Sequence, residues 1–227
     1  MTIIGNLIGD LCYFVALDNI GVGRALSTAN SYPIFVSIFS VLLLGETLSI
    51  KLLTGTTIII VGLAFLNLTR KSVFPPSGKI RSNTLGFFLA FLTSMLWASM
   101  LLMQKWVLTA QGVEPLTLTF YRSVSLISIS WGFWYLRKNN EERKHVFKVG
   151  LKKWLSPFLA GAISLGFGGV SFVYALKTIP VSVAAPITAT NPVIAALLAK
   201  YAFNEKLSPV QWFGIVLVII GGIQVGS

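Results

Sequence analysis

Two prolines lie in the middle of long apolar stretches, Pro33 in one and Pro192 in the other. A proline inside a helix cannot donate a backbone hydrogen bond, so a carbonyl four residues earlier loses its partner. Polar side chains lie close to both prolines, and the candidate solute-binding residues among them are Asn30, Tyr32, Thr188 and Asn191. In a membrane, polar groups beside a bent helix are tolerated where they line a solute cavity, which is the role we expect. The alternative is that neighbouring serine and threonine hydroxyls satisfy the freed carbonyls locally.

Arg122 and Asp10 lie well inside apolar stretches, where a charge is costly. Arg122 lies within its stretch, and burying an arginine at membrane depth costs about 3 kcal/mol. With Tyr121 beside it, Arg122 is a candidate site for an anionic or carboxylate-bearing solute; the alternatives are a structural ion pair or a side chain that extends to the membrane surface. Asp10 is an acidic residue well inside a stretch. Its candidate roles are a structural charge partner and a proton-coupling carboxylate.

Aromatic residues complete the candidate site. We expect Trp97 and Tyr174 to stack on a solute, although contact with lipid or with the protein core is the alternative for each. Glu46 and Glu205 each precede an apolar stretch, where a carboxylate binds the free amides at the start of the next helix. The sequence has no phosphate-binding loop, no framework of metal ligands and no nucleophile paired with a base, so it predicts no catalytic residue, no metal site and no cofactor.

The chain that positions these residues is strongly apolar. Of its 227 residues, 55% are hydrophobic and 11% are charged, and the mean hydropathy is +0.79. These values lie outside the range of soluble proteins. Eight apolar stretches can be drawn, at residues 3–17, 25–44, 49–69, 84–107, 115–136, 154–176, 181–203 and 209–226. Stretches of about 20 residues cross the ~30 Å of hydrocarbon, so the sequence predicts an all-α integral membrane protein with about eight transmembrane helices.

The formal charge of +11 does not indicate nucleic-acid binding. The basic residues lie in short clusters between the apolar stretches, which is typical of loops that set membrane orientation. With eight crossings, fourteen of the 18 lysines and arginines fall on one face and three on the opposite face. This bias places the first face in the cytoplasm and both termini outside.

An internal repeat relates the two halves of the chain. The segment from Gly9 to Gly62 recurs without a gap from Gly168 to Gly221, at an offset of 159 residues. Five crossings separate the matching stretches, and an odd number turns the second copy upside down. The glycine pairs Gly55 and Gly62, and Gly214 and Gly221, each share one helix face. They predict close helix packing, with a homodimer through the glycine-rich helices as the alternative.

The repeat also predicts how the chain is divided. Residues 1–70 form an incomplete first repeat of three helices, residues 71–82 a linker, and residues 83–227 a second repeat of five helices. The counterparts of the stretches at 84–107 and 115–136 would lie before residue 1. We therefore expect an N-terminally truncated bundle that lacks the first two of ten helices.

A longer motif occurs in both repeats, from Ala16 to Gly62 and from Ala175 to Gly221. It consists of Ala-Leu, a short turn, a helix of small residues with a central proline, then Leu-Gly-Glu-Thr-Leu-Ser and a glycine-rich helix. This motif resembles the EamA family of the drug/metabolite transporter superfamily, although Asn204 replaces the glycine that usually precedes the glutamate. The resemblance implies ten helices in two inverted repeats, outward transport of small metabolites, and a cytoplasmic C-terminus. The loop charges predict the opposite orientation, so both orientations stay open.

The residues and the resemblance together predict a multi-pass permease of the cytoplasmic membrane. It would move a small polar metabolite, an amino acid or a related compound, outward by alternating access. Its partners would be that solute and the lipid bilayer, and not nucleic acid. The alternatives are a lipid-handling subunit or a membrane enzyme, because members of the superfamily can act on lipid-linked sugars, and an inactive truncated fragment.

Overall fold

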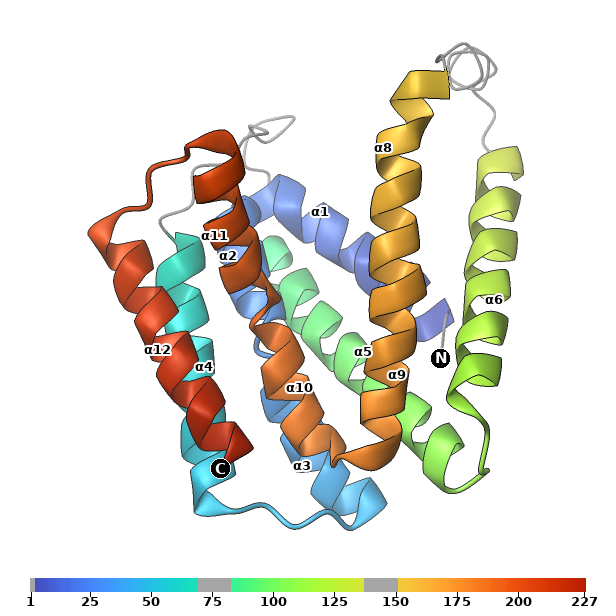
Figure 1. Ribbon diagram of the computed structural model, residues 1–227, viewed down its shortest axis with the longest axis horizontal. Coiled ribbons are helices and arrows are strands. Elements are labelled where there is room, and N and C mark those ends of the chain that lie inside the picture. Colours follow the sequence, from blue (N-terminus) through green and yellow to red (C-terminus); the bar gives the residue numbers. More distant parts are fainter. Residues whose placement is uncertain (1–2, 69–82, 137–150) are drawn as a thin grey trace. The chain divides into compact units, whose positions relative to one another are not determined.

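The computed structural model describes residues 3–68, 83–136 and 151–227, and the described part is helical apart from short connections (Figure 1). Its first repeat contains the π-helix η1 (Ile3–Gly9) and the α-helices α1 (Asp10–Ile20), α2 (Val22–Ala29), α3 (Tyr32–Leu44) and α4 (Ile50–Leu68). The remainder contains α5 (Asn83–Thr109), α6 (Pro115–Leu136), α8 (Leu151–Gly161), the π-helix η2 (Ala162–Gly168), α9 (Gly169–Thr178), α10 (Val181–Ala189), α11 (Asn191–Phe203) and α12 (Pro209–Gly226). The predicted all-α fold is confirmed, whereas the predicted linker at 71–82 lies outside the described residues.

The described helices agree with the predicted membrane spans in position. Six described stretches are long and apolar enough to cross a membrane: Val22–Leu44, Ile50–Asn67, Asn83–Thr109, Lys153–Thr178, Val181–Ala202 and Pro209–Gly226. The predicted spans at 3–17 and 115–136 are helical but are not among these six. Arg122 and several serines and threonines make the second of them more polar.

The two repeats fold into the same succession of elements. Adding 159 to the first residue of η1, α1, α2, α3 and α4 gives the first residue of η2, α9, α10, α11 and α12. The agreement extends to the turns, because Gly45 after α3 has a φ of 67° and Asn204 after α11 has a φ of 53°. Left-handed backbone favours glycine, and asparagine is among the residues that tolerate it. Asn204 therefore replaces the usual glycine of the motif without changing the turn.

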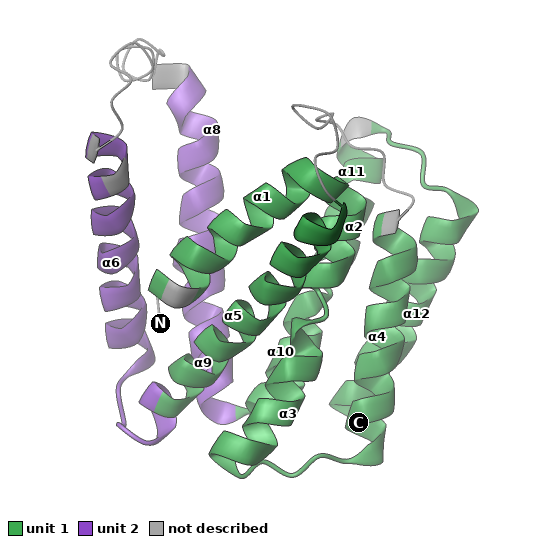
Figure 2. Ribbon diagram, turned by 180° about the vertical axis from the view of Figure 1, so that it is seen from behind, with its two compact units in different colours: residues 1, 3–106, 179–227 green, residues 2, 107–178 purple. Residues whose placement is uncertain are grey.

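Internal contacts divide the chain into two compact units (Figure 2). Unit 1 comprises residues 3–106 and 179–227, and unit 2 comprises residues 107–178. Unit 1 holds elements of both repeats, since it contains η1 to α4 together with most of α5 and α10 to α12. This division describes packing within the chain, whereas the repeat boundaries at 70 and 83 describe its sequence and stay a prediction.

Within unit 1, α4 and α12 lie side by side and run in opposite directions (Figure 1). Gly62 of α4 faces Gly214 of α12, and a Cβ atom added to Gly62 would lie 2.7 Å from the carbonyl oxygen of Gly214. Likewise, a Cβ atom on Gly221 would lie 2.6 Å from the carbonyl oxygen of Gly55. The repeat relates Gly55 to Gly214 and Gly62 to Gly221, so the contact has the approximate twofold symmetry of an inverted repeat.

All four glycines are buried within one chain. The structure therefore supports the packing interpretation, because small residues let two helix backbones approach closely. The alternative, a homodimer through these glycine faces, is not supported, since α4 and α12 cover the faces of each other.

Each of these two helices begins with a serine cap. The Ser49 hydroxyl accepts a hydrogen bond from the Leu52 amide at 3.1 Å at the start of α4. Before α12, the Ser208 hydroxyl accepts from the Gln211 amide at 3.3 Å, and the Gln211 side chain accepts from the Ser208 amide at 2.8 Å. This reciprocal pair is a capping box, which satisfies amides that the helix itself leaves free.

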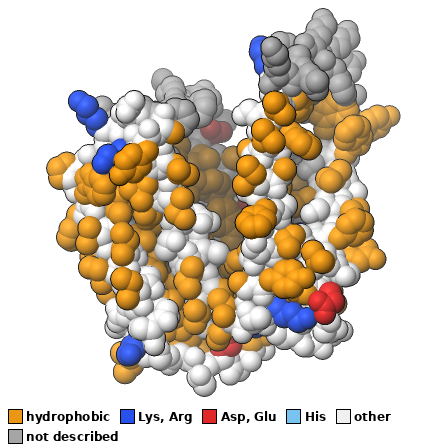
Figure 3. All heavy atoms as spheres, viewed as in Figure 1, with side chains coloured by type: hydrophobic (Ala, Val, Ile, Leu, Met, Phe, Trp, Pro, Cys, Tyr) orange, Lys and Arg blue, Asp and Glu red, His pale blue; other side chains and the backbone are white. Residues whose placement is uncertain are grey.

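The outward surface of this helix pair is apolar. The space-filling view shows hydrophobic side chains spread over α11 and α12 (Figure 3). On α12, Phe213, Ile219 and Ile223 are exposed, the last with 69% of its side chain accessible. Exposed side chains of this kind on a chain of +0.79 mean hydropathy are those expected to contact lipid.

The glycine contact makes a stability prediction. Replacing Gly221 with alanine places a methyl group against the backbone of Gly55, where no flexible side chain can move aside. We expect Gly221→Ala to lower the free energy of unfolding by about 1–3 kcal/mol, the range for overpacked interiors. The measurement is the thermal unfolding of detergent-solubilised protein, followed by size-exclusion fluorescence.

The adjacent residue supplies the control. A Cβ atom added to Gly222 meets nothing within 4 Å. Gly222→Ala should be neutral or slightly stabilising, because alanine is the better helix former by about 1 kcal/mol. Equal melting curves for the two variants would contradict the close contact of α4 with α12.

Candidate functional site

Both predicted proline bends are breaks between two helices. Residues 30–31 form a turn between α2 and α3, and Thr190 forms the turn between α10 and α11. Pro33 and Pro192 each lie in the first turn of the helix that follows, where a proline needs no backbone partner. Each proline therefore lies in the middle of a membrane span, as predicted, but it starts the second of two helices and does not interrupt a continuous one.

A hydroxyl group adds a hydrogen bond to the backbone at each break. The Ser31 side chain donates to the Thr28 carbonyl at 2.7 Å, and the Thr190 side chain donates to the Ile187 carbonyl at 2.7 Å. Ser31 and Thr190 are repeat partners, 159 residues apart. These two hydroxyls bond carbonyls five residues before each proline, whereas the carbonyls that the prolines would free lie at Ala29 and Thr188. The choice between local satisfaction and cavity lining stays open.

The two breaks are joined by a tyrosine. Tyr32, the first residue of α3, has its hydroxyl 3.1 Å from the Ala185 carbonyl and 3.2 Å from the Thr188 hydroxyl, both on α10. The Tyr32 side chain is buried. Two of the predicted solute-binding residues, one from each repeat, therefore lie together where α3 packs against α10.

Trp97 of α5 extends this junction toward α1. Its indole nitrogen donates a hydrogen bond of 3.0 Å to Oδ1 of Asp10. Its ring centroid lies 5.5 Å from that of Tyr13, and 6.2 Å from that of Tyr32 in an edge-on arrangement. We call Asp10, Tyr13, Tyr32 and Trp97 the aromatic–carboxylate cluster. All four residues belong to unit 1.

The backbone before Asp10 explains how α1 comes so close to α5. The π-helix η1 ends at Gly9, whose carbonyl accepts a hydrogen bond of 3.2 Å from the Thr93 hydroxyl of α5. A Cβ atom on Gly9 would lie 3.2 Å from the Trp97 ring. A π-helix leaves irregular backbone hydrogen bonding and often marks a functional segment. Here it directly precedes the carboxylate.

The two predicted asparagines have different environments. Asn30 is 6% exposed, and its side-chain nitrogen is buried without a hydrogen-bond partner among the described residues. Asn191 is exposed. Asn191 is the repeat partner of Tyr32, not of Asn30, so the symmetry does not place the two amides at equivalent positions. No described contact joins them.

The remaining predicted residues lie in unit 2. Arg122 is partly buried, and one of its terminal nitrogens would lie 3.1 Å from a Cβ atom added to Gly169 of α9. Tyr121 is 64% exposed and its ring packs edge-on against Phe120. Tyr174 is 45% exposed. Their role in binding a solute stays a prediction.

Glu46 makes a contact that the sequence did not indicate. Its carboxylate accepts hydrogen bonds from the amides of Val181 at 2.8 Å and Ser182 at 3.1 Å, and from the Ser182 hydroxyl at 2.6 Å. Glu46 therefore caps α10 of the other repeat, whereas the prediction assigned it to the next helix, α4. Ser49 already caps α4, which explains the difference. Its repeat partner Glu205 is exposed.

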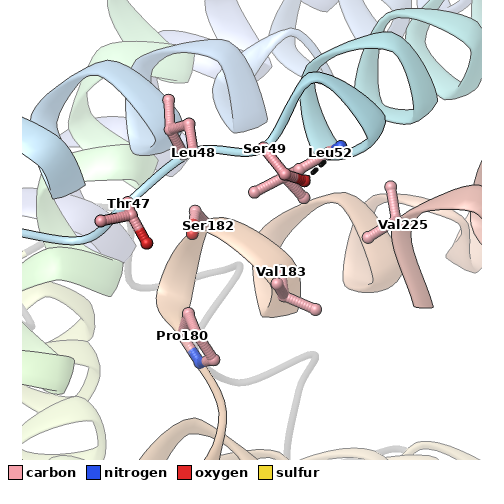
Figure 4. Close-up of a pocket in the computed structure, with 8 residues that line it drawn as sticks. All are labelled: Thr47, Leu48, Ser49, Leu52, Pro180, Ser182, Val183 and Val225. Carbon is pink, nitrogen blue, oxygen red and sulfur yellow. Dashed lines mark hydrogen bonds between the residues drawn. The ribbon is translucent and has the colours of Figure 1, made fainter. Parts of the chain in front are cut away.

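A lysine strengthens the same end of unit 1. The Lys105 ammonium donates a 2.8 Å hydrogen bond to the carbonyl of Ile179, two residues before Val181. Beside it, a cavity of about 300 Å³ is lined by Thr47, Ser49, Pro180 and Ser182 among others (Figure 4). In this view the Thr47 hydroxyl points toward Ser182. The predicted solute-binding residues do not line this cavity.

The comparison with known protein families agrees with the two-repeat organisation. The model of the EamA-like transporter family matches residues 1–68 and 84–225. This chain belongs to the EamA-like transporter family. The resemblance deduced from the motif from Ala16 to Gly62 is confirmed.

Individual relatives of this EamA-like chain include small subunits. The probable 4-amino-4-deoxy-L-arabinose-phosphoundecaprenol flippase subunit ArnE of Pseudomonas fluorescens is 42% identical over 77 residues, which is 34% of this chain and 68% of the relative. The subunit of the same name from Pectobacterium atrosepticum is 37% identical over 68 residues, 30% of this chain and 58% of the relative.

A solved crystal structure has the same fold. It superposes with a TM-score of 0.79 and 20% sequence identity, covering 98% of this chain and 74% of the other. The similarity extends over the whole EamA-like chain and supports its helical arrangement. At this identity it carries no information about the solute.

The family places the chain in the membrane and among transporters. It is a multi-pass integral membrane protein whose helices are surrounded by lipid. The names of the relatives describe translocation and not catalysis, in agreement with the prediction that the chain is not an enzyme. In the part of the chain that the structure describes, no group of three or more His, Cys, Asp or Glu side chains is placed to hold a metal ion.

Glu46 provides a test of the contact between the repeats. Glutamine has one neutral acceptor oxygen in place of the two anionic oxygens that bond Val181 and Ser182. The start of α10 therefore loses part of its cap. We expect Glu46→Gln to lower the free energy of unfolding by about 2 kcal/mol, because hydrogen bonds to charged groups are worth about 1.5–3 kcal/mol each. Thermal unfolding in detergent measures the loss.

The matched control is Glu205→Gln. The Glu205 side chain is exposed and occupies the equivalent position of the second repeat. This change should leave the unfolding free energy within about 0.5 kcal/mol of the unchanged protein. If both variants lose the same unfolding free energy, the cap on α10 does not explain the loss in Glu46→Gln.

Proposed function

We propose that this chain is a permease that moves a small polar metabolite, such as an amino acid or a related compound, out of the cell by alternating access. Its EamA-like family supports a transporter, and the arrangement of unit 1 supports this type of mechanism. The single observation that carries the proposal is the hydrogen bonding of Tyr32 to Ala185 and Thr188, which joins the broken helices of the two repeats.

Broken helices at a repeat interface suit solute binding for a physical reason. Polar backbone and side-chain groups inside a membrane need partners, and a bound solute can supply them. Asn30 lies in the turn between α2 and α3. Its side-chain nitrogen is buried without a hydrogen-bond partner in the described part of the chain. An unsatisfied buried donor costs about 1–3 kcal/mol. Occupation of the junction by a polar solute would recover that cost.

The contacts within unit 1 also fit a rocking motion. The glycine contact of α4 with α12 is a close backbone packing that can act as a pivot. In contrast, α3 and α10 are joined at the breaks by the hydroxyl of one tyrosine. Neutral hydrogen bonds contribute about 0.5–1.5 kcal/mol each, so breaking them is compatible with two populated states.

Tyr32 is therefore the residue that tests the mechanism. Tyr32→Phe keeps the ring against Trp97 and removes the hydroxyl that bonds α10. We expect the variant to insert and fold, with an initial rate of transport changed about threefold to tenfold, the equivalent of about 1 kcal/mol. The rate of counterflow in proteoliposomes measures the effect. An unchanged rate would remove Tyr32 from the mechanism.

A second function is favoured by two observations. The relatives from Pseudomonas fluorescens and Pectobacterium atrosepticum are named as subunits of a flippase for an amino sugar on a prenyl phosphate. Unit 2 contains an apolar cavity of about 530 Å³, lined by Trp131, Trp134 and Trp154 among others. A cavity with these walls suits a hydrocarbon chain. The second candidate is therefore a subunit that moves the polar head group of a lipid.

Reconstitution distinguishes the two candidates. Proteoliposomes loaded with an unlabelled amino acid or amino sugar should take up the labelled compound by saturable counterflow if the chain carries small solutes. A fluorescent short-chain prenyl-phosphate sugar in the same vesicles reports movement of a lipid head group. Lipid movement without counterflow would favour the second candidate. If the vesicles show neither counterflow nor lipid movement although protease protection shows correct insertion, both candidate functions are contradicted.

A further inference from the structure

We propose that the aromatic–carboxylate cluster binds a positively charged amino group, so that Asp10 and the rings of Tyr13, Tyr32 and Trp97 select solutes that carry an ammonium. This inference rests on the proposed transport function and names the chemical class of the substrate. The ammonium can belong to a free solute or to a lipid head group, and the recognition chemistry is the same for both.

The first argument is the charge of Asp10. It lies in the middle of the helical stretch of residues 3–20 and is partly buried. In the described part of the chain its carboxylate accepts one hydrogen bond, at Oδ1 from Trp97, and forms no ion pair. A carboxylate at membrane depth without a cation is costly, and such residues usually mark an ion or substrate pathway. An incoming ammonium would supply the missing charge.

The second argument is the set of rings packed around Trp97, whose indole bonds the carboxylate. Trp97 lies within 5.5 Å of Tyr13 and 6.2 Å of Tyr32, measured between ring centroids. Trp97 is also held in place by its hydrogen bond to Asp10. Cations are attracted to the faces of tryptophan and tyrosine rings, and this attraction grows when water is excluded. A carboxylate beside several rings is therefore an arrangement that recognises ammonium groups.

The third argument is the position of the cluster in the fold. Tyr32 belongs both to the cluster and to the junction between α3 and α10. A group that binds at the cluster therefore contacts the residue that joins the two repeats. Binding can change the stability of this junction only by interacting differently with its two states, which direct contact with Tyr32 permits.

The experiment compares solutes that differ only in the amino group. Proteoliposomes containing the full chain are tested for counterflow with three pairs: L-alanine and L-lactate, L-serine and L-glycerate, and D-glucosamine and D-glucose. Short-chain fluorescent phosphatidylethanolamine and phosphatidylglycerol form the lipid pair in the same vesicles. We expect the member with the amino group to be transported at least tenfold faster in the pairs that are transported.

The assignment to Asp10 is tested by two variants of α1. Asp10→Asn keeps the shape of the side chain and removes its charge, and should reduce the amine preference by about tenfold, the value of one charge-assisted hydrogen bond. Asp10→Glu should retain the preference. Asp18→Asn is the control, since Asp18 is exposed on the same helix and should leave the preference unchanged.

The outcomes separate this inference from the proposed function. Transport of both members of a pair at equal rates would overturn the inference and leave the permease in place. A preference for the amine that survives Asp10→Asn would overturn the role of Asp10. Transport of no solute and no lipid would overturn the proposed function and this inference with it. If Asp10→Asn does not insert, the amine preference of the unchanged protein still decides whether the inference stands.

Discussion

The close contact between α4 and α12 is the constraint on which unit 1 depends. Lipid is as apolar as the helix surfaces, so helices in a membrane gain little by burying hydrocarbon and must gain by close packing. Gly55 and Gly62 bring the backbone of α4 against that of α12, where Gly214 and Gly221 lie. Because each helix is the last of its repeat and the two run in opposite directions, this contact also fixes the repeats as inverted copies within unit 1.

The inverted repeats are symmetric in backbone but not in side chains. At one end of the α4 and α12 pair, Thr54 accepts a hydrogen bond from Gln224 at 2.6 Å. The repeat partners of these residues, Phe213 and Phe65, pack edge-on at 5.4 Å at the other end. One end of the pair is therefore joined by a polar contact and the other by an aromatic one. Two helices related by the repeat thus form a pair whose ends differ in chemistry.

Much of the fold could be predicted from the sequence because its determinants are local or periodic. Apolar stretches define the helices, and the offset of 159 residues predicts the first residue of each repeated element correctly. The candidate site was predicted less completely. Asp10 and Trp97 were each singled out, but their pairing depends on how α1 packs against α5. Glu46 was assigned to the next helix because local capping is the commoner pattern, and only the packing of the repeats reveals its partner on α10.

Packing also explains why polar groups of unit 1 gather where α1, α5, α3 and α10 meet. A carboxylate, an indole nitrogen and a tyrosine hydroxyl form one connected series from Asp10 through Trp97 to Tyr32, which continues to Thr188. Inside a membrane each of these groups would be costly by itself, and hydrogen bonds provide partners for the indole nitrogen and the tyrosine hydroxyl. The series also crosses from the first repeat to the second. An ammonium that binds at Asp10, as we propose, would act through these two aromatic rings on the hydrogen bonds that hold α3 against α10.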